Sequence, residues 1–227
     1  MQGMGSGQGF WTLLSPDERS VLSALGSARD YPAGATLCLE GDPATHVFVL
    51  LVGWVKVFSA TKDGKEIMLA LRGDNDIVGE TAGETTGRRN ATIQAIGKVR
   101  ALIVPHDKFS SFLDTNSGAD RAYRRVVTQK FNDADAIVRG RTGTSGAQRL
   151  ARLLLDLAER HGSEVNGEVH VVMPLSQAEL ASLAGTSRAT VTRAFSNWRK
   201  RGFVRTSPRH ITIIDQAGLH KVAGRQQ

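Results

Sequence analysis

The stretch LSQAELASLAGTSRATVTRAFSNW, residues 175–198, decides the fold of the carboxyl-terminal part of the chain. Ser176 followed three residues later by Glu179 is the pattern of a capping box at a helix start. Gly185 is the residue type that most often ends a helix, and Ser187 can cap the next one. The sequence therefore predicts two short helices joined by a tight turn.

The second of these helices has two chemically different faces. Apolar residues recur at helical spacing and are predicted to face the core: Val191, Ala194, Phe195 and Trp198. Four residues are predicted to project outward: Arg188, Ala189, Thr192 and Arg193. Helix-turn-helix geometry places such a surface in the DNA major groove, where each arginine can bind O6 and N7 of a guanine. The hydroxyls of Thr186, Ser187 and Thr190 are suited to donate hydrogen bonds to DNA phosphates. The alternative is a helical hairpin whose arginines only solvate its surface.

The distribution of charge favours a polyanionic partner for this part of the chain. Residues 141–227 contain 13 Lys+Arg and 6 Asp+Glu, whereas residues 1–140 contain 16 of each, so the carboxyl-terminal part carries the whole net charge of +7. Lys200 ends the second helix, in a basic run that could also be a solvated helix end. Arg209 lies between the predicted strands 204–206 and 211–214, which form a β wing. Both residues are predicted to approach a DNA backbone.

The amino-terminal part has the pattern of a β-sandwich or barrel. Ser15-Pro-Asp-Glu18 predicts a helix that ends near residue 26. Short β-rich runs separated by glycines then predict strands at 35–39, 47–51, 55–59, 67–71, 91–95 and 99–104. Asp63-Gly64 predicts a two-residue hairpin turn.

After Pro105 the pattern becomes helical, with predicted helices at 106–113, 117–139 and 148–161 and a strand at 168–173. A stripe on the long helix contains Tyr123, Val126, Val127, Phe131, Ala134, Ile137 and Val138. The stripe either packs on its own β domain or forms a dimer seam, and the strong charge elsewhere on this helix favours the seam. We therefore expect a β domain at 10–116, a dimerisation helix at 117–140, a hinge at 141–146 and a DNA-binding domain at 147–227.

Several classes of protein do not fit the sequence. The longest apolar run, 47–55, is shorter than a membrane span requires, so we expect no membrane partner and a cytoplasmic protein. Cys38 is the single cysteine and no His or Cys cluster has metal-ligand spacing. No catalytic constellation remains once the two domains are accounted for, which disfavours an enzyme.

Over residues 10–220 the sequence resembles the cyclic-AMP receptor protein and FNR (Crp/Fnr) family of transcription regulators. The resemblance implies an α+β fold: a cyclic-nucleotide-binding β-roll, which is a double-stranded β-helix, then a long dimerisation helix and a winged helix-turn-helix. The family's phosphate-binding cassette begins with Gly-Glu and ends with Arg-Ser-Ala or Arg-Thr-Ala. This sequence has Gly79-Glu80-Thr81 and Arg89-Asn90-Ala91 at the two ends. The cysteine set and haem ligands of the gas-sensing branches are absent.

By this resemblance Arg89 would hold a cyclic phosphate, and Glu80 would accept from a ribose hydroxyl. A buried arginine needs an anionic partner, and glycine lets backbone approach the phosphate oxygens. The alternative is an internal Glu80–Arg89 salt bridge that closes an empty pocket. Asn90 replaces the family's hydroxyl residue, and Ala134 and Asp135 stand where the cyclic-AMP binders present a threonine–serine pair. The resemblance makes cyclic AMP a candidate effector, although these departures concern the positions that would hold its phosphate and adenine. No covalent cofactor is expected.

The resemblance implies a homodimer on a near-palindromic operator, with recognition helices in major grooves about 34 Å apart. RNA polymerase is a further candidate partner. Ala189 stands where the cyclic-AMP receptor has a cytosine-reading glutamate, so we expect an altered preference at that base pair and a contact with a thymine methyl. The alternative function is constitutive DNA binding with a vestigial or differently specific pocket.

Overall fold

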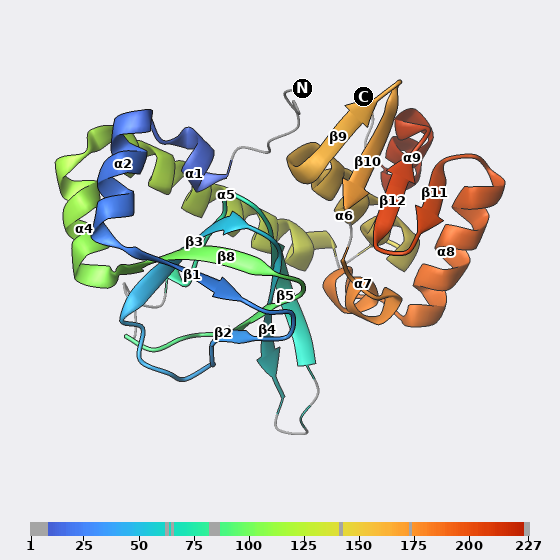
Figure 1. Ribbon diagram of the computed structural model, residues 1–227. Helices are drawn as coiled ribbons and strands as arrows, with labels where there is room; N and C mark the ends of the chain where they lie inside the picture. The colour runs from blue at the N-terminus through green and yellow to red at the C-terminus, as the bar shows by residue number, and fades with distance from the viewer. Residues whose placement is uncertain are drawn as a thin grey trace. The chain divides into compact units, whose positions relative to one another are not determined.

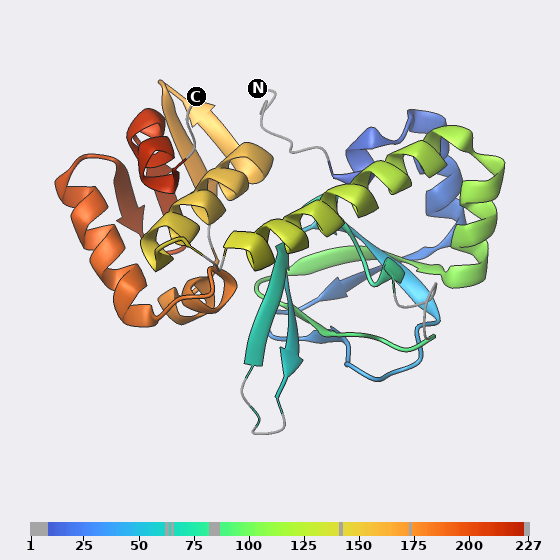
Figure 2. The same cartoon turned by 180° about the vertical axis from the view of Figure 1, so that it is seen from behind.

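The computed structural model describes residues 9–61, 64, 66–81, 87–140, 143–172 and 174–224, with side chains at 135–140 left aside. The chain divides into two compact units between residues 131 and 132. Figures 1 and 2 show the strands and helices of each unit from opposite sides.

The amino-terminal unit contains two antiparallel sheets of four strands each. The first has the order β1-β8-β3-β6 and the second β2-β7-β4-β5. Their bounds are β1 Ser27–Tyr31, β2 Thr36–Cys38, β3 His46–Val52, β4 Val55–Ala60, β5 Glu66–Arg72, β6 Ile77–Val78, β7 Thr92–Ala95 and β8 Val99–Pro105. All six predicted strands are confirmed, each within about two residues of its predicted ends.

Strand β3 reads as a continuous apolar run because both of its faces are covered. Phe48 and Leu50 point into the core between the two sheets. Val47 and Val49 point the other way, into a second core that helices complete. Neighbouring side chains of a strand alternate between its two faces. When both faces are buried, every position faces a core and is apolar.

Four helices enclose the outer core of this unit: α1 Phe10–Leu13, α2 Pro16–Leu25, α4 His106–Thr115 and the long α5 Ser117–Gly140. The predicted capping box is present, because Ser15 Oγ accepts from Glu18 N and Glu18 Oε2 accepts from Ser15 N. These bonds lower the pKa of Glu18. Phe10 is fully buried, with its ring edge-on to the rings of Phe109 and Tyr123.

The carboxyl-terminal unit combines the sheet β11-β12-β10-β9 with four helices. The elements are α6 Gly146–His161, β9 Gly162–Val165, β10 Glu168–Val172, α7 Gln177–Leu183, α8 Arg188–Lys200, β11 Val204–Ser207, β12 His210–Ile213 and α9 Gln216–Ala223. Helix α6 begins earlier than predicted because Ser145 and Gln148 form a capping box of their own. The two-helix turn and the wing are confirmed.

Elements with weak periodicity escaped prediction: α1, β1, β6, β9 and α9. Strand β1, SARDY, exposes four of its five residues and so lacks the alternation that marks a strand. The hairpin turn predicted at Asp63-Gly64 includes a residue outside the described ones, although β4 and β5 pair from Ala60 and Glu66 back to Val55 and Arg72. The domain boundaries given above stay a prediction.

Candidate effector pocket and nucleic-acid interface

Arg89 is a buried cation held by neutral groups. The residue is only 3% exposed to solvent. Nη1 donates to the carbonyl of Gly79 at 2.9 Å, and Nη2 donates to the carbonyl of His46 at 2.7 Å. The guanidinium carbon lies 5.5 Å from the centre of the Phe48 ring, a cation–π contact. Nε is buried and has no hydrogen-bond partner among the described residues.

Gly79 is required by the packing of this arginine. Its φ of +79° is in the left-handed region that favours glycine. A Cβ at this position would lie 2.4 Å from Nη1 of Arg89, so any side chain would displace the guanidinium. It is the carbonyl of Gly79, not an N–H group, that faces the arginine.

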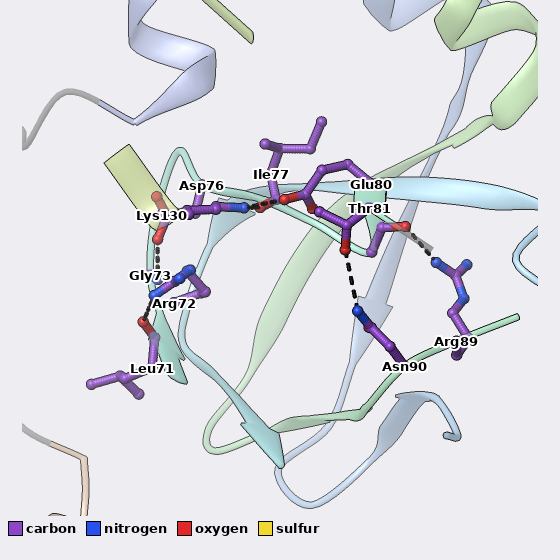
Figure 3. A network of polar contacts seen from close by, with 11 residues as sticks. Leu71, Arg72, Gly73, Asp76, Ile77, Glu80, Thr81, Arg89, Asn90 and Lys130 are labelled. Carbon is purple, nitrogen blue, oxygen red and sulfur yellow. Dashed lines mark hydrogen bonds and ion pairs between the residues drawn. The ribbon is translucent and has the colours of Figure 1, made fainter. Parts of the chain in front are cut away.

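Glu80 pairs with a lysine from α5. Glu80 is 3% exposed, and its Oε1 accepts from Lys130 Nζ at 2.6 Å, while the same ammonium donates to the carbonyl of Ile77 at 2.5 Å. The alternative of an internal Glu80–Arg89 salt bridge is wrong: among the described ion pairs, the carboxylate belongs to Lys130. Figure 3 shows Lys130 reaching Glu80. Nothing in the sequence pattern indicates this lysine.

The remaining cassette residues lie around this pair of charges. Asn90 Nδ2 and Thr81 Oγ1, both in exposed residues, are 3.4 Å apart, and Ala91 is buried. His46 lies beside Arg89, with its ring edge-on to Phe48. Burial, and secondarily the charge of Arg89, hold the pKa of His46 below its ordinary value.

Helix α8 is anchored by the apolar stripe that the sequence predicted. Val191, Ala194, Phe195 and Trp198 are all buried, and the last two rings meet edge-to-face at 5.9 Å. Gly185 adopts a φ of +60° at the turn. Ser187 caps the helix by accepting from Thr190 N at 3.1 Å. The sequence therefore fixes which side of α8 faces away from the core.

The outward side of α8 carries the predicted DNA-reading residues. Arg188, Ala189 and Arg193 are exposed, and within the described part of the chain the guanidinium of neither arginine has a hydrogen bond or ion pair. Thr192 is exposed but engaged: its hydroxyl lies 2.7 Å from Gln177 Oε1 and 3.0 Å from the carbonyl of Arg188. Thr186 is half-buried at the turn.

The two residues predicted to approach a DNA backbone, Lys200 and Arg209, also lie on the surface of this unit. Lys200 is exposed at the end of α8. Arg209 is exposed between β11 and β12 and has a φ of +59°, which is unusual for a residue with a side chain. This conformation belongs to the tight turn of the wing.

Both halves of the chain match known domain families. Residues 28–116 match the cyclic nucleotide-binding domain, and residues 148–222 match the Crp-like helix-turn-helix domain. The chain is 28% identical over 215 residues to the CRP-like cAMP-activated global transcriptional regulator of Mycobacterium tuberculosis, covering 95% of this chain and 96% of that one. The chain belongs to the Crp/Fnr family of transcription regulators.

Further comparisons agree with the Crp/Fnr assignment. The cyclic AMP receptor protein of Thermus thermophilus is 25% identical, with 92% of this chain and 94% of that one covered. A CooA variant from Carboxydothermus hydrogenoformans has the same fold, with a TM-score of 0.78, 21% identity and coverage of 98% and 99%. No described helix is long and apolar enough to cross a membrane.

For a Crp/Fnr protein, the predicted dimer stripe on α5 divides unexpectedly. Tyr123 and Val126 are buried in the core of their own β-roll, and Val127 packs against the same core. The prediction that these three residues form the seam is therefore corrected. Phe131 is 71% exposed and Ala134 is exposed, so they remain available. The side chains of Ile137 and Val138 lie outside the described ones.

Proposed function

We propose that this chain is a homodimeric, sequence-specific Crp/Fnr regulator whose DNA binding is controlled by a cyclic nucleotide in the β-roll. One observation supports the effector part of this proposal. Among the described residues, the buried guanidinium of Arg89 has no carboxylate partner, and its Nε has no hydrogen-bond acceptor. Burying a charge is costly unless a counter-charge compensates it. A cyclic phosphodiester supplies one negative charge and two exocyclic oxygens.

The other cassette groups are suited to the rest of such an effector. Asn90 can donate its amide N–H groups to a phosphate oxygen in place of the family's hydroxyl. Glu80 retains a second carboxylate oxygen for a ribose hydroxyl while Lys130 holds the first. Cyclic AMP is the first candidate because the relatives from M. tuberculosis and T. thermophilus are named for it.

The DNA part of the proposal concerns how the operator is read. Arg188 and Arg193 project freely from the first two turns of α8 and would each bind a guanine edge. The hydroxyls and N–H groups at residues 186–190, with Lys200 and Arg209, would contact phosphates. Ala189 offers no acceptor and would contact a thymine methyl.

Dimerisation would use the outer part of α5, where Phe131 is exposed, and would place the two α8 helices on a near-palindromic site. RNA polymerase is the expected further partner, the cytoplasm the expected location, and no catalysis is expected. The effector must bind one arrangement of the dimer more tightly than the other if it is to regulate.

The effector is tested by isothermal calorimetry of the full chain with cyclic AMP, cyclic GMP and a cyclic dinucleotide. We expect saturable heat with at least one of them. Arg89→Met should abolish it, since the charge-assisted contact is lost. The matched control is Arg88→Met at the neighbouring, exposed arginine, which should retain it. Absence of heat with all three ligands would contradict effector control.

A second candidate is constitutive DNA binding with a closed pocket. It is favoured by the carbonyls of Gly79 and His46, each of which already accepts from one Nη group of Arg89, and by Lys130, which already neutralises Glu80. Gel-shift titration with fragments of the host genome separates the two. Equal binding with and without the ligands supports the constitutive form, and failure to bind any fragment tightly contradicts both.

A further inference from the structure

Arg149, in the first turn of α6, binds three backbone carbonyls from two segments far apart in the sequence. Nε donates to the carbonyl of Ala184 at 3.0 Å, and Nη2 donates to that of Gly185 at 2.6 Å. Nη1 donates to the carbonyl of Thr144 at 2.7 Å. One rigid guanidinium therefore joins the linker before α6 to the turn between α7 and α8.

Ala184 is the C-cap residue of α7, and Gly185 is the residue that follows it. The last carbonyls of a helix have no partner within it and carry partial negative charge, so a cation beside them is favourable. Gly185 is in the left-handed conformation, and the chain then passes directly into Thr186 and the cap residue Ser187. Holding these two carbonyls fixes where α8 begins.

Gly146 brings the backbone of α6 against the same turn. A Cβ at this position would lie 2.0 Å from Thr186 Oγ1, 2.9 Å from Thr186 Cβ and 3.1 Å from Thr190 Cγ2. Both threonines flank the cap of α8. The start of α6 thus contacts the DNA-reading turn in two ways: through the fork of Arg149 and through direct backbone packing at Gly146.

We infer that Arg149 is a positioning residue of the DNA interface, which fixes the start of α8 relative to the linker at Thr144. It touches no DNA itself. The inference rests on the proposed DNA-reading role of α8. A change in the linker would move Thr144, and the shared guanidinium would pass that movement to Ala184 and Gly185. The planar fork matters, because a lysine ammonium cannot hold three carbonyls in this arrangement.

The test uses Arg149→Lys in the full chain, which keeps the charge and removes the fork. Duplexes selected by the unaltered chain from random sequences serve as operators, and scrambled duplexes of equal length serve as random DNA. Fluorescence anisotropy measures both affinities. We expect operator affinity to fall about tenfold, from the loss of bonds that hold the turn. Affinity for random DNA should stay unchanged, because the net charge is the same.

The matched control is Arg152→Lys, one turn further along α6. Arg152 Nε also donates to a backbone carbonyl, that of Ala223, at 2.8 Å, but at the end of α9. It should leave discrimination between operator and random DNA intact. Equal losses in Arg149→Lys and Arg152→Lys would overturn the inference, because the effect would then be a general loosening of the unit. Unchanged discrimination in a folded Arg149→Lys chain would overturn it as well.

Gly146→Ala provides an independent variant, should Arg149→Lys melt below the assay temperature. Alanine is a better helix former than glycine, so α6 itself should not weaken. The added methyl should nevertheless displace Thr186 and reduce discrimination, and full discrimination in this variant would overturn the inference. If the unaltered chain selects no operator at all, the proposed role of α8 fails, and this inference fails with it.

Discussion

The two units of this chain use arginine in opposite ways. In the β-roll, Arg89 is buried, stacked on Phe48 and bonded to two carbonyls. On α8, Arg188 and Arg193 are exposed, and their guanidinium groups make no hydrogen bond or ion pair within the described chain.

The difference teaches how to interpret each site. An exposed arginine is solvated by water, so the lack of a protein partner costs no free energy. Its guanidinium is available to an external polyanion. A buried arginine with an unpartnered Nε loses solvation that the fold does not fully return. The proposed anionic effector would compensate such a group. The comparison predicts stability effects at the first site and specificity effects at the second.

The largest expected effect is on stability, at the ion pair beside Arg89. Lys130→Met should lower the free energy of unfolding by about 3 kcal/mol, because Glu80 is left as an unpaired buried carboxylate. Urea denaturation at neutral pH measures it. The control is Lys108→Met, an exposed lysine on α4, which should change stability by less than about 0.5 kcal/mol.

A matched rescue separates charge from packing at this pair. Glu80→Gln combined with Lys130→Met removes both charges and should recover much of the lost stability. If Lys130→Met is no more destabilising than Lys108→Met, the pocket is well solvated, and the contrast between its charges and those of α8 breaks down.

At the surface site the expected effect is on discrimination. Arg193→Ala should cost about 1–3 kcal/mol of preference for the operator over random DNA and leave the unfolding midpoint unchanged. Lys200→Ala should weaken both DNAs alike and reduce the slope of log affinity against log salt by about 1. Both are read from anisotropy titrations at several salt concentrations. Equal losses on both DNAs for Arg193→Ala would remove its assignment to a base.

Much of the fold could be predicted because its signals are local. The capping boxes at Ser15 and Ser176, the turn at Gly185 and the apolar spacing of α8 each lie within a few residues, and all are found as predicted. Strand β1 was missed because exposed polar residues hide its alternation. Its place is set by pairing with β8, more than 60 residues away, from Ser27↔Ile103 to Tyr31↔Val99.

The site divides in the same way. The cassette motif located Gly79, Glu80 and Arg89, but the partner of Glu80 is Lys130, 50 residues later. Within a highly charged helix one lysine carries no distinguishing signal. The apolar stripe on α5 does not by itself indicate what covers it, and Tyr123 packs on its own domain. Arg149 likewise has no local pattern that points to Gly185.

A smaller effect is expected at the exposed alanine between the two reading arginines. Ala189→Glu adds a carboxylate that can accept from a cytosine N4 amino group, so it should shift the selected operator towards cytosine at one base pair by about tenfold. Selection from random duplexes, repeated with both chains, measures it. Ala189→Gln is the control of equal size. An unchanged selected sequence would mean that residue 189 does not face a base.

The smallest effect concerns protons at the buried site. In the free chain, burial and then the charge of Arg89 lower the pKa of His46. An anion on Arg89 offsets the second cause, so the pKa of His46 should rise on binding while burial still keeps it low. The complex then takes up a fraction of a proton at pH values near the lowered pKa of His46, and effector affinity increases as pH falls through that range. Calorimetry in two buffers of different ionisation enthalpy counts the protons, and His46→Gln should reduce the uptake to zero. Proton release on binding would place the anion away from Arg89. It would contradict the proposal that this buried arginine holds the effector.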